Sequence, residues 1–191
     1  MEFIVQYFTF WFGLVFLFME LYLNFRYRNK KERKKAADKN SLSILWITIV
    51  SAFVLGGFGW KFPSAAMSQG QPYVYYFGMF FAISGLVLRQ VAIRQLGKSF
   101  TVDVQIAQGQ DLKRSGLYAY IRHPSYTGIL MAFTGLAVTY ANWISLAVIL
   151  VPVFCAFAYR IRIEEAALRA EFGPAYEEYC RQTKRLIPFI Y

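Results

Sequence analysis

Residues 125–159 read SYTGILMAFTGLAVTYANWISLAVILVPVFCAFAY, and this apolar stretch decides the fold class of the chain. A membrane-spanning helix needs about 20 apolar residues, because a rise of about 1.5 Å per residue must cover about 30 Å of hydrocarbon. The stretch is too long for one span, and Ala141-Asn142 is a weak turn signal near its middle. We therefore expect two helical segments of roughly 16 residues each, folded back on each other as an antiparallel hairpin.

Three upstream segments are also long and apolar enough to cross a membrane, namely residues 3–25, 42–62 and 72–93. The first is predicted to be a membrane helix and not a signal peptide, because it starts at the acidic Glu2 and no small-residue cleavage site follows. Together with the hairpin, these segments predict an all-α polytopic membrane protein with five transmembrane segments.

The composition supports the membrane class. Hydrophobic residues make up 57% of the 191 residues, aromatic residues 19% and charged residues 17%, whereas a typical soluble domain has about 25% charged residues. A soluble fold of this length could not bury so many aromatic side chains, and disordered or disulfide-stapled classes fit poorly. Cys155 and Cys180 are separate and have no Cys/His cluster beside them, so we expect free thiols and no structural zinc site.

The basic residues indicate the orientation in the membrane. The chain has 21 Lys+Arg against 11 Asp+Glu, a net charge of +10, and the basic residues cluster in residues 26–39, 94–122 and 160–185, whereas the loop 63–71 has none. The positive-inside rule then predicts an outer N-terminus and a cytosolic C-terminus. The loop 26–39 is expected to determine topology and to attract anionic lipids. It lacks the stacking aromatics of a nucleic-acid site, so no nucleic-acid partner is expected.

The predicted membrane segments contain a few small and ionisable residues. Gly78, Ala82 and Gly85 follow helical spacing and are expected to let a neighbouring helix approach closely. Glu20 and Arg89 lie near the cytosolic ends of their segments, and we expect both side chains to snorkel towards the interface, although a substrate role stays open.

A polar region follows the third segment. The sequence GKSF at residues 97–100 breaks the helix, and a glycine-punctuated loop, residues 109–118, leads into YIRHPSY at residues 120–126. Pro124 suits the first turn of the next helix, whose free N–H groups could bind an anion at the cytosolic interface. His123 is the single histidine of the chain and, taken alone, is expected to act as a capping or hydrogen-bonding group. A metal site is not expected there.

The second half of the hairpin ends in charged residues. Arg160 and Glu164 are four residues apart and therefore share one face of a helix where the apolar stretch ends. Taken alone, they could form an ordinary surface ion pair. The sequence FGP at residues 172–174 is expected to end this helix and begin another, with glycine after the last turn and proline in the first turn.

These residues together form a recognisable pattern. GxYxxxRHPxYxG at residues 116–128, followed by EExxLxxxFGxxYxxY at residues 164–179, resembles the isoprenylcysteine carboxyl methyltransferase family, and the likeness covers residues 105–188. Phospholipid N-methyltransferases share looser versions of these motifs. Some membrane sterol reductases have a C-terminal region of similar build that binds a nicotinamide cofactor.

The resemblance implies that S-adenosylmethionine binds in a cytosol-facing pocket of the C-terminal helices, without a Rossmann fold. It divides the chain into residues 1–96, three transmembrane helices with the basic cytosolic loop 26–39, and residues 97–191, the catalytic region. Glu164 would hold the amino end of the cofactor and Arg160 would bind the substrate carboxylate, which makes these two the candidate catalytic residues. The other implied cofactor-binding residues are Gln105, Gln110, Asp111, Leu112, Lys113, Tyr118, His123, Pro124, Ser125 and Tyr126.

The residue chemistry agrees with these implied roles. A carboxylate has a reference pKa near 4 and needs no general base at neutral pH, whereas an amine acceptor must lose a proton. The planar fork of Arg160 matches two carboxylate oxygens. The leading hypothesis is therefore methyl transfer to the carboxylate of a lipophilic, isoprenylcysteine-like or isoprenoid acid reached from the bilayer. Phospholipid headgroup N-methylation, NADPH-dependent sterol-type reduction and a non-enzymatic scaffold remain as alternatives.

Two further expectations concern the setting of the protein. The short loops between the segments resemble those of prokaryotic proteins, so the resemblance implies a bacterial or archaeal cell membrane. The partners expected are membrane lipids and a lipophilic or prenylated substrate, and the oligomeric state is left open.

Overall fold

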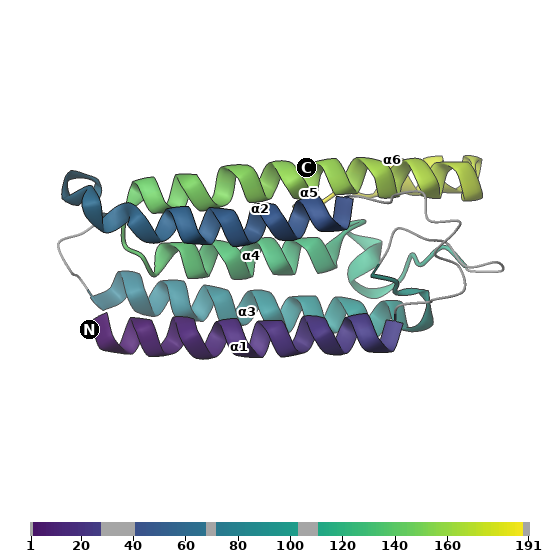
Figure 1. Ribbon diagram of the computed structural model, residues 1–191. Coiled ribbons are helices and arrows are strands. Elements are labelled where there is room, and N and C mark those ends of the chain that lie inside the picture. Colours follow the sequence, from purple (N-terminus) through teal and green to yellow (C-terminus); the bar gives the residue numbers. More distant parts are fainter. Residues whose placement is uncertain (1, 28–40, 68–71, 103–110, 189–191) are drawn as a thin grey trace.

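The fold was analysed in a computed structural model that describes residues 2–27, 41–67, 72–102 and 111–188. The described residues form a bundle of long helices without a β-strand (Figure 1). Short 3-10 turns at Gly57–Lys61, Pro63–Ala65, Gly97–Ser99 and Gly116–Ala119 connect some of them. The α-helices are α1 (Glu2–Tyr27), α2 (Ser41–Gly56), α3 (Pro72–Leu96), α4 (Pro124–Val138), α5 (Trp143–Phe172) and α6 (Pro174–Gln182).

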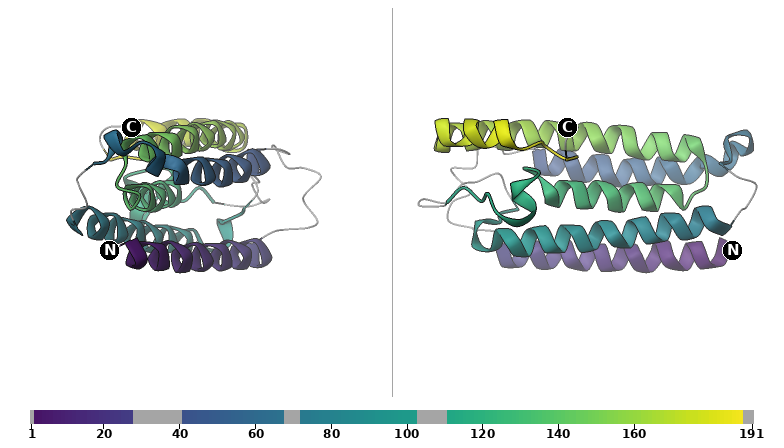
Figure 2. Two further views of the ribbon diagram at one scale, coloured as in Figure 1. Left: turned by 60° about the vertical axis from the view of Figure 1, so that its left-hand side comes forward. Right: turned by 180° about the vertical axis from the view of Figure 1, so that it is seen from behind.

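The helices lie in three layers. In Figure 1, α1 and α3 run side by side in one layer, α4 lies in the middle, and α2 and α5 form the opposite layer; Figure 2 shows the same order from behind. The C-terminal part of α5 extends past the other helices, and α6 folds back beside it. The connections at this end of the bundle, together with α6, surround the site described below.

The long helices have membrane dimensions. Among the residues that the structure describes, four helices are long and apolar enough to cross a bilayer: Phe3–Tyr27, Ser41–Lys61, Pro72–Leu96 and Trp143–Phe172. The prediction of an all-helical, multi-pass membrane protein is thus confirmed. The fifth predicted segment corresponds to α4, whose 15 residues extend only about 22 Å.

Helix α4 packs unusually closely on α3 because glycines line the contact. A methyl group built at Gly135 would lie 2.2 Å from the backbone nitrogen of Ala82, and one at Gly85 would lie 2.3 Å from that of Ala132. Side chains larger than hydrogen would therefore force the two backbones apart. The predicted packing role of Gly78, Ala82 and Gly85 is confirmed.

The hairpin between α4 and α5 turns where the sequence predicts it. Ala141 adopts a positive φ of 47°, and Asn142 caps α5 by accepting hydrogen bonds from the backbone nitrogens of Ile144 and Ser145 at 2.9 and 3.1 Å. The amide of Asn142 also donates to the carbonyls of Gly59 and Phe62, both at 3.1 Å. One side chain therefore joins the hairpin tip to the turn that follows α2.

Glu20 and Arg89 form a buried ion pair, so the prediction that they snorkel to the interface is wrong. Each residue is 6% exposed, and the Arg89 guanidinium donates to Glu20 Oε1 from Nη2 at 2.6 Å and from Nε at 3.0 Å. Arg89 Nη1 donates in addition to Ser125 Oγ at 3.0 Å. The two charges pair inside the bundle because Glu20 of α1 and Arg89 of α3 lie on helix faces that are turned towards each other. Through Arg89, α1 is also connected to Ser125 in the first turn of α4.

Candidate active site

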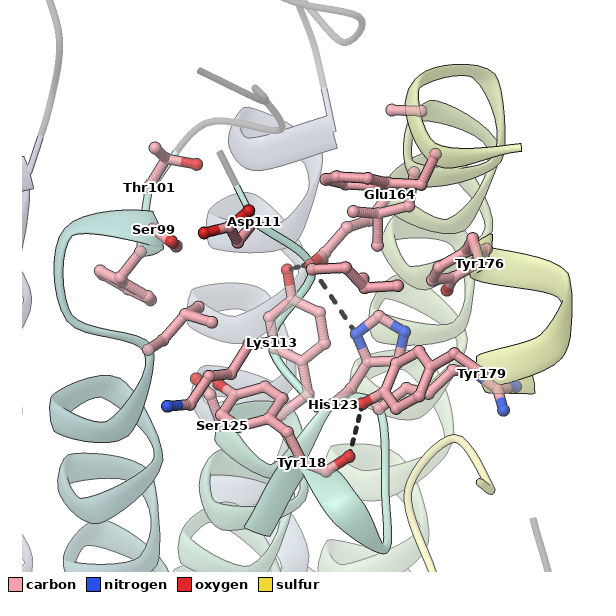
Figure 3. A pocket seen from close by; sticks show the side chains of 18 of the residues that line it. Ser99, Thr101, Asp111, Lys113, Tyr118, His123, Ser125, Glu164, Tyr176 and Tyr179 are labelled. Atoms are coloured by element: carbon pink, nitrogen blue, oxygen red, sulfur yellow. Dashed lines mark hydrogen bonds and ion pairs between the residues drawn. The ribbon is translucent and has the colours of Figure 1, made fainter. Parts of the chain in front are cut away.

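A cavity opens at the end of the bundle where α3, α4, α5 and α6 meet (Figure 3). The space between its walls is about 880 Å³ when the open mouth is included. Apolar, aromatic and charged side chains all contribute to its wall. The lining residues are Leu96, Ser99, Phe100, Thr101, Asp111, Leu112, Lys113, Tyr118, Arg122, His123, Ser125, Tyr126, Arg160, Glu164, Ala167, Leu168, Phe172, Tyr176 and Tyr179.

Most of the residues singled out in the sequence meet in this cavity. Of the predicted positions that the structure describes, only Pro124 does not line the wall: it is buried in the first turn of α4 and starts that helix as predicted. Gln105 and Gln110 lie outside the described residues. The predicted positions that line the cavity are Asp111, Leu112, Lys113, Tyr118, His123, Ser125, Tyr126, Arg160 and Glu164.

The hydroxyl of Tyr126 links Arg160 to Glu164. It donates to Glu164 Oε2 at 2.7 Å and accepts from Arg160 Nε at 3.0 Å. Arg160 is 4% exposed and also donates from Nη1 to Ser41 Oγ at 3.0 Å and from Nη2 to the carbonyl of Val102. The predicted pair of α5 is thus linked through Tyr126, with Arg160 buried and the Glu164 side chain 32% exposed; it is not an ordinary surface ion pair.

His123 lies between two carboxylates of α5. Its Nδ1 is 3.8 Å from Glu164 Oε1, its Nε2 is 3.6 Å from Glu165 Oε1, and its ring stacks on that of Tyr126 at a centroid distance of 5.5 Å. His123 precedes α4 at the N-cap position, but its imidazole makes no capping hydrogen bond; of the predicted capping or hydrogen-bonding role, the capping part is wrong, and the ring faces carboxylates instead. The reason is that the ring turns away from the helix start towards α5.

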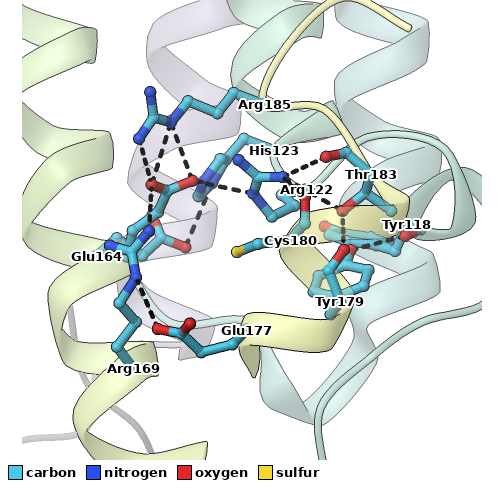
Figure 4. A network of polar contacts seen from close by, with 11 residues as sticks. Tyr118, Arg122, His123, Glu164, Arg169, Glu177, Tyr179, Cys180, Thr183 and Arg185 are labelled. Atoms are coloured by element: carbon cyan, nitrogen blue, oxygen red, sulfur yellow. Dashed lines mark hydrogen bonds and ion pairs between the residues drawn. The ribbon is translucent and has the colours of Figure 1, made fainter. Parts of the chain in front are cut away.

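Glu165 organises a second polar network through Arg122, His123 and Arg185, and Figure 4 shows these three partners. Its carboxylate is completely buried and accepts from Arg122 Nε at 3.0 Å and from Arg185 Nη2 at 2.8 Å. The backbone nitrogens of Arg122 and His123 donate to the carbonyls of Lys184 and Arg185 at 2.8 and 3.0 Å. Residues 184–185 therefore hold the backbone from which His123 projects. Arg122 and Glu165 belong to the RHP and EExxL motifs, but the sequence does not predict that they contact each other.

Three buried tyrosines complete one side of the cavity. The Tyr179 hydroxyl donates to the backbone carbonyl of Tyr118 at 2.7 Å, which joins α6 to the 3-10 turn before α4. Burial raises the pKa of the Tyr118 phenol far above its usual range, and the nearby Glu164 carboxylate raises it further. Burial does the same to the pKa of Tyr176. These phenols therefore stay neutral and can serve as hydrogen-bond donors.

A second cavity, about 490 Å³ with its open mouth included, adjoins this site. Phe100, Thr101, Tyr126 and Arg160 line both cavities. Beyond this junction the wall of the second cavity is mostly apolar, apart from the ion pair of Glu20 and Arg89. Its other lining residues are Phe16, Leu42, Leu45, Trp46, Ile49, Val102, Ile129 and Phe157. The wall is thus polar towards the surface and mostly apolar inside the bundle, with Arg160 and Tyr126 between the two parts.

No group of three His, Cys, Asp or Glu residues in the described ranges has the geometry of a metal site. Cys155 and Cys180 are free thiols, as predicted.

Known proteins share this region of the chain. The profile of the Isoprenylcysteine carboxyl methyltransferase (ICMT) family matches residues 78–170. The chain is 37% identical over 116 residues to protein-S-isoprenylcysteine O-methyltransferase B of Arabidopsis thaliana, covering 60% of this chain and 59% of that one. It is 36% identical over 112 residues to the protein-S-isoprenylcysteine O-methyltransferase of Schizosaccharomyces pombe, covering 58% of this chain and 48% of that one.

A solved structure is also similar. The eukaryotic intramembrane Ras methyltransferase ICMT superposes with a TM-score of 0.64 at 31% identity, covering 75% of this chain and 52% of that chain. The chain spans between 59% and 63% of the length of the plant relatives that it matches. The matched residues include most of the cavity wall on α3, α4 and α5. The family profile, the curated relatives and the solved structure agree, and all three show that this region of the chain is similar to the isoprenylcysteine carboxyl methyltransferase family.

Proposed function

We propose that this protein transfers a methyl group from S-adenosylmethionine to the carboxylate of a lipophilic, isoprenylcysteine-like acceptor at the cytosolic face of a membrane. The observation that carries this proposal is the junction of the two cavities, where Arg160 and Tyr126 line both. A polar cofactor and an apolar acceptor could meet there. The relatives named as isoprenylcysteine O-methyltransferases support the same reaction.

The residues of the first cavity fit S-adenosylmethionine. Its carboxylates Glu164 and Asp111 can accept hydrogen bonds from an ammonium group or from ribose hydroxyls, and Leu168 and Phe172 offer apolar surface. The neutral phenol of Tyr176 adds a buried hydroxyl to this wall. When bound, this cofactor supplies an electrophilic methyl group on a positively charged sulfur.

Arg160 is the proposed anchor of the acceptor carboxylate. A carboxylate is ionised at neutral pH, so the site needs no base to activate it, and the contribution of the protein is alignment and exclusion of water. Arg160 projects from α5 into the junction, and its planar guanidinium suits two carboxylate oxygens. The apolar tail of the acceptor would occupy the second cavity, beside Phe16 and Trp46.

In this proposal the cavity lies at the cytosolic end of the bundle. Arg26 and Arg94 lie in the last turns of α1 and α3. In Figure 1 these helix ends lie on the same side of the bundle as the start of α4, where Ser125 and Tyr126 line the cavity. The positive-inside rule then places the N-terminus outside, with α4 as a fifth, short membrane segment next to α3. Residues 97–191 would form the methyl-transfer region.

The test is transfer of labelled methyl from S-adenosylmethionine to farnesylcysteine analogues and to extracted phospholipids by the purified protein. We expect base-labile, ester-type label on the cysteine analogue, and its loss in Arg160→Ala and Glu164→Gln. Arg162→Ala and Glu171→Gln are matched controls, because both residues are exposed on the same helix, and these variants should retain activity. Base-stable label in the phospholipid fraction would replace the proposal with headgroup N-methylation. Protection from thermal unfolding by NADPH, without protection by S-adenosylmethionine, would favour a reductase.

A further inference from the structure

Ser41, the first residue of α2, contacts the guanidinium of Arg160. Its hydroxyl accepts a hydrogen bond from Arg160 Nη1 at 3.0 Å, and the residue is 2% exposed. Ser41 lies outside residues 78–170, the part of the chain that the family profile matches. The contact therefore brings the N-terminal part of the chain directly to the proposed acceptor anchor.

The contacts of Arg160 determine the plane of its guanidinium. Nε is held by the Tyr126 hydroxyl of α4, Nη1 by the Ser41 hydroxyl of α2, and Nη2 by the carbonyl of Val102. A flexible arginine side chain carries about 2 kcal/mol of rotamer entropy, and contacts to three nitrogens from three segments remove that freedom before a ligand binds. With contacts to only two of its nitrogens, the guanidinium could still rotate about the line that joins them.

We propose that Ser41 is a positioning residue that orients Arg160 for recognition of the acceptor carboxylate. The proposal rests on the proposed function, because it takes Arg160 as the carboxylate anchor. A bidentate pair between a guanidinium and a carboxylate depends on the orientation of both planes. Loss of the Ser41 hydroxyl removes the hydrogen bond to Arg160 Nη1, so the guanidinium is less well oriented and the acceptor binds less tightly. Ser41 does not line the first cavity, so the residues that line it stay unchanged. Helix α2 thus contributes to specificity as well as to packing.

The test compares Ser41→Ala, Ser41→Thr and Ser43→Ala in steady-state methyl transfer to a farnesylcysteine analogue. Ser43 is exposed in the first turn of the same helix and is the matched control. Loss of a hydrogen bond to a charged group weakens an interaction by about tenfold. We expect Ser41→Ala to raise the acceptor KM by about tenfold and to leave the KM for S-adenosylmethionine within about twofold. Ser41→Thr, which keeps the hydroxyl, should recover most of the loss, and Ser43→Ala should match the parent protein.

A serine at the start of a helix can also stabilise the helix itself, so a second comparison isolates the link to Arg160. In an Arg160→Lys background the planar fork is absent, and Ser41→Ala should have no further effect on the acceptor KM. A full additional loss in that background would overturn the proposal, as would a lowered Tm of Ser41→Ala with an unchanged acceptor KM. Should Ser41→Ala fail to fold, Ser41→Cys provides the same comparison.

The outcomes also separate this inference from the proposed function. If Arg160→Lys transfers methyl to the carboxylate acceptor as well as the parent protein, Arg160 is not the anchor and the proposed function loses its main residue. If Arg160→Lys is impaired and Ser41→Ala is not, the proposed function stands and the positioning role of Ser41 is refuted.

Discussion

Replacing Glu20 with glutamine should destabilise the bundle strongly. Glutamine has almost the same shape, so the change removes a charge and leaves the packing of α1 intact. The Arg89 guanidinium would then remain buried, with Ser125 Oγ as its other contact at 3.0 Å. Removing one partner of a buried ion pair costs about 3–5 kcal/mol, because the remaining charge is left uncompensated.

The cost can be measured as a shift of thermal unfolding. For a chain of 150–250 residues, about 1 kcal/mol lowers Tm by about 2–4 °C, so Glu20→Gln should lower Tm by roughly 6–20 °C. The assay is tryptophan fluorescence during heating of the protein in lipid nanodiscs. Glu171→Gln, which removes an exposed carboxylate of α5, should change the free energy of unfolding by less than about 0.5 kcal/mol.

A double variant tests the reason for the loss. Glu20→Gln with Arg89→Gln removes both charges, so no uncompensated ion remains and most of the lost stability should return. The reasoning is refuted if Glu20→Gln unfolds within about 1 °C of the parent protein. It is also refuted if the double variant is less stable than the single one.

Three further substitutions test the packing, the hairpin and the tail. Gly135→Ala would place a methyl group 2.2 Å from the backbone of α3, and overpacking of this kind costs about 1–3 kcal/mol or more. We expect a lower yield of monodisperse protein in size-exclusion chromatography. Gly13→Ala is the control, because Gly13 has open space around it, and its yield should not change. Asn142→Ala removes the cap of α5 and should cost about 1–2 kcal/mol, seen as a lower Tm. Arg185→Gln should weaken S-adenosylmethionine binding in calorimetry by about tenfold and leave the acceptor KM unchanged, because the tail supports His123; equal loss of both constants would contradict this role.

The helices were predictable because their signal is local. Length and apolar composition are properties of one segment, so residues 72–93 predict α3 within a few residues, and the turn at Ala141-Asn142 follows from two neighbouring residues. The short motifs were equally informative for the cavity wall, since RHPxY and EExxL place their side chains at the ends of α4 and α5. Family resemblance supplied the roles that spacing did not.

The long-range polar pairs could not be predicted in the same way. Glu20 and Arg89 are 69 residues apart, and their pairing depends on how α1 and α3 are rotated about their axes, which no local pattern records. The contact between Ser41 and Arg160 spans 119 residues. Glu165 was visible in its motif, yet its partner Arg185 follows only after α6 has turned the chain back. In each case the sequence shows which polar group a residue carries, but it does not show which distant residue that group contacts.

The pairing of residues 184–185 with the start of α4 determines when the site can be completed during biosynthesis. Helices α3 and α4 can associate as soon as both have been inserted, since their glycine-lined contact needs nothing from later in the chain. The backbone of His123, however, finds its hydrogen-bond acceptor only after Arg185 has left the ribosome. Until then the Glu165 carboxylate also lacks one of its arginines. Translation that stalls before this point would leave a bundle without a finished cavity.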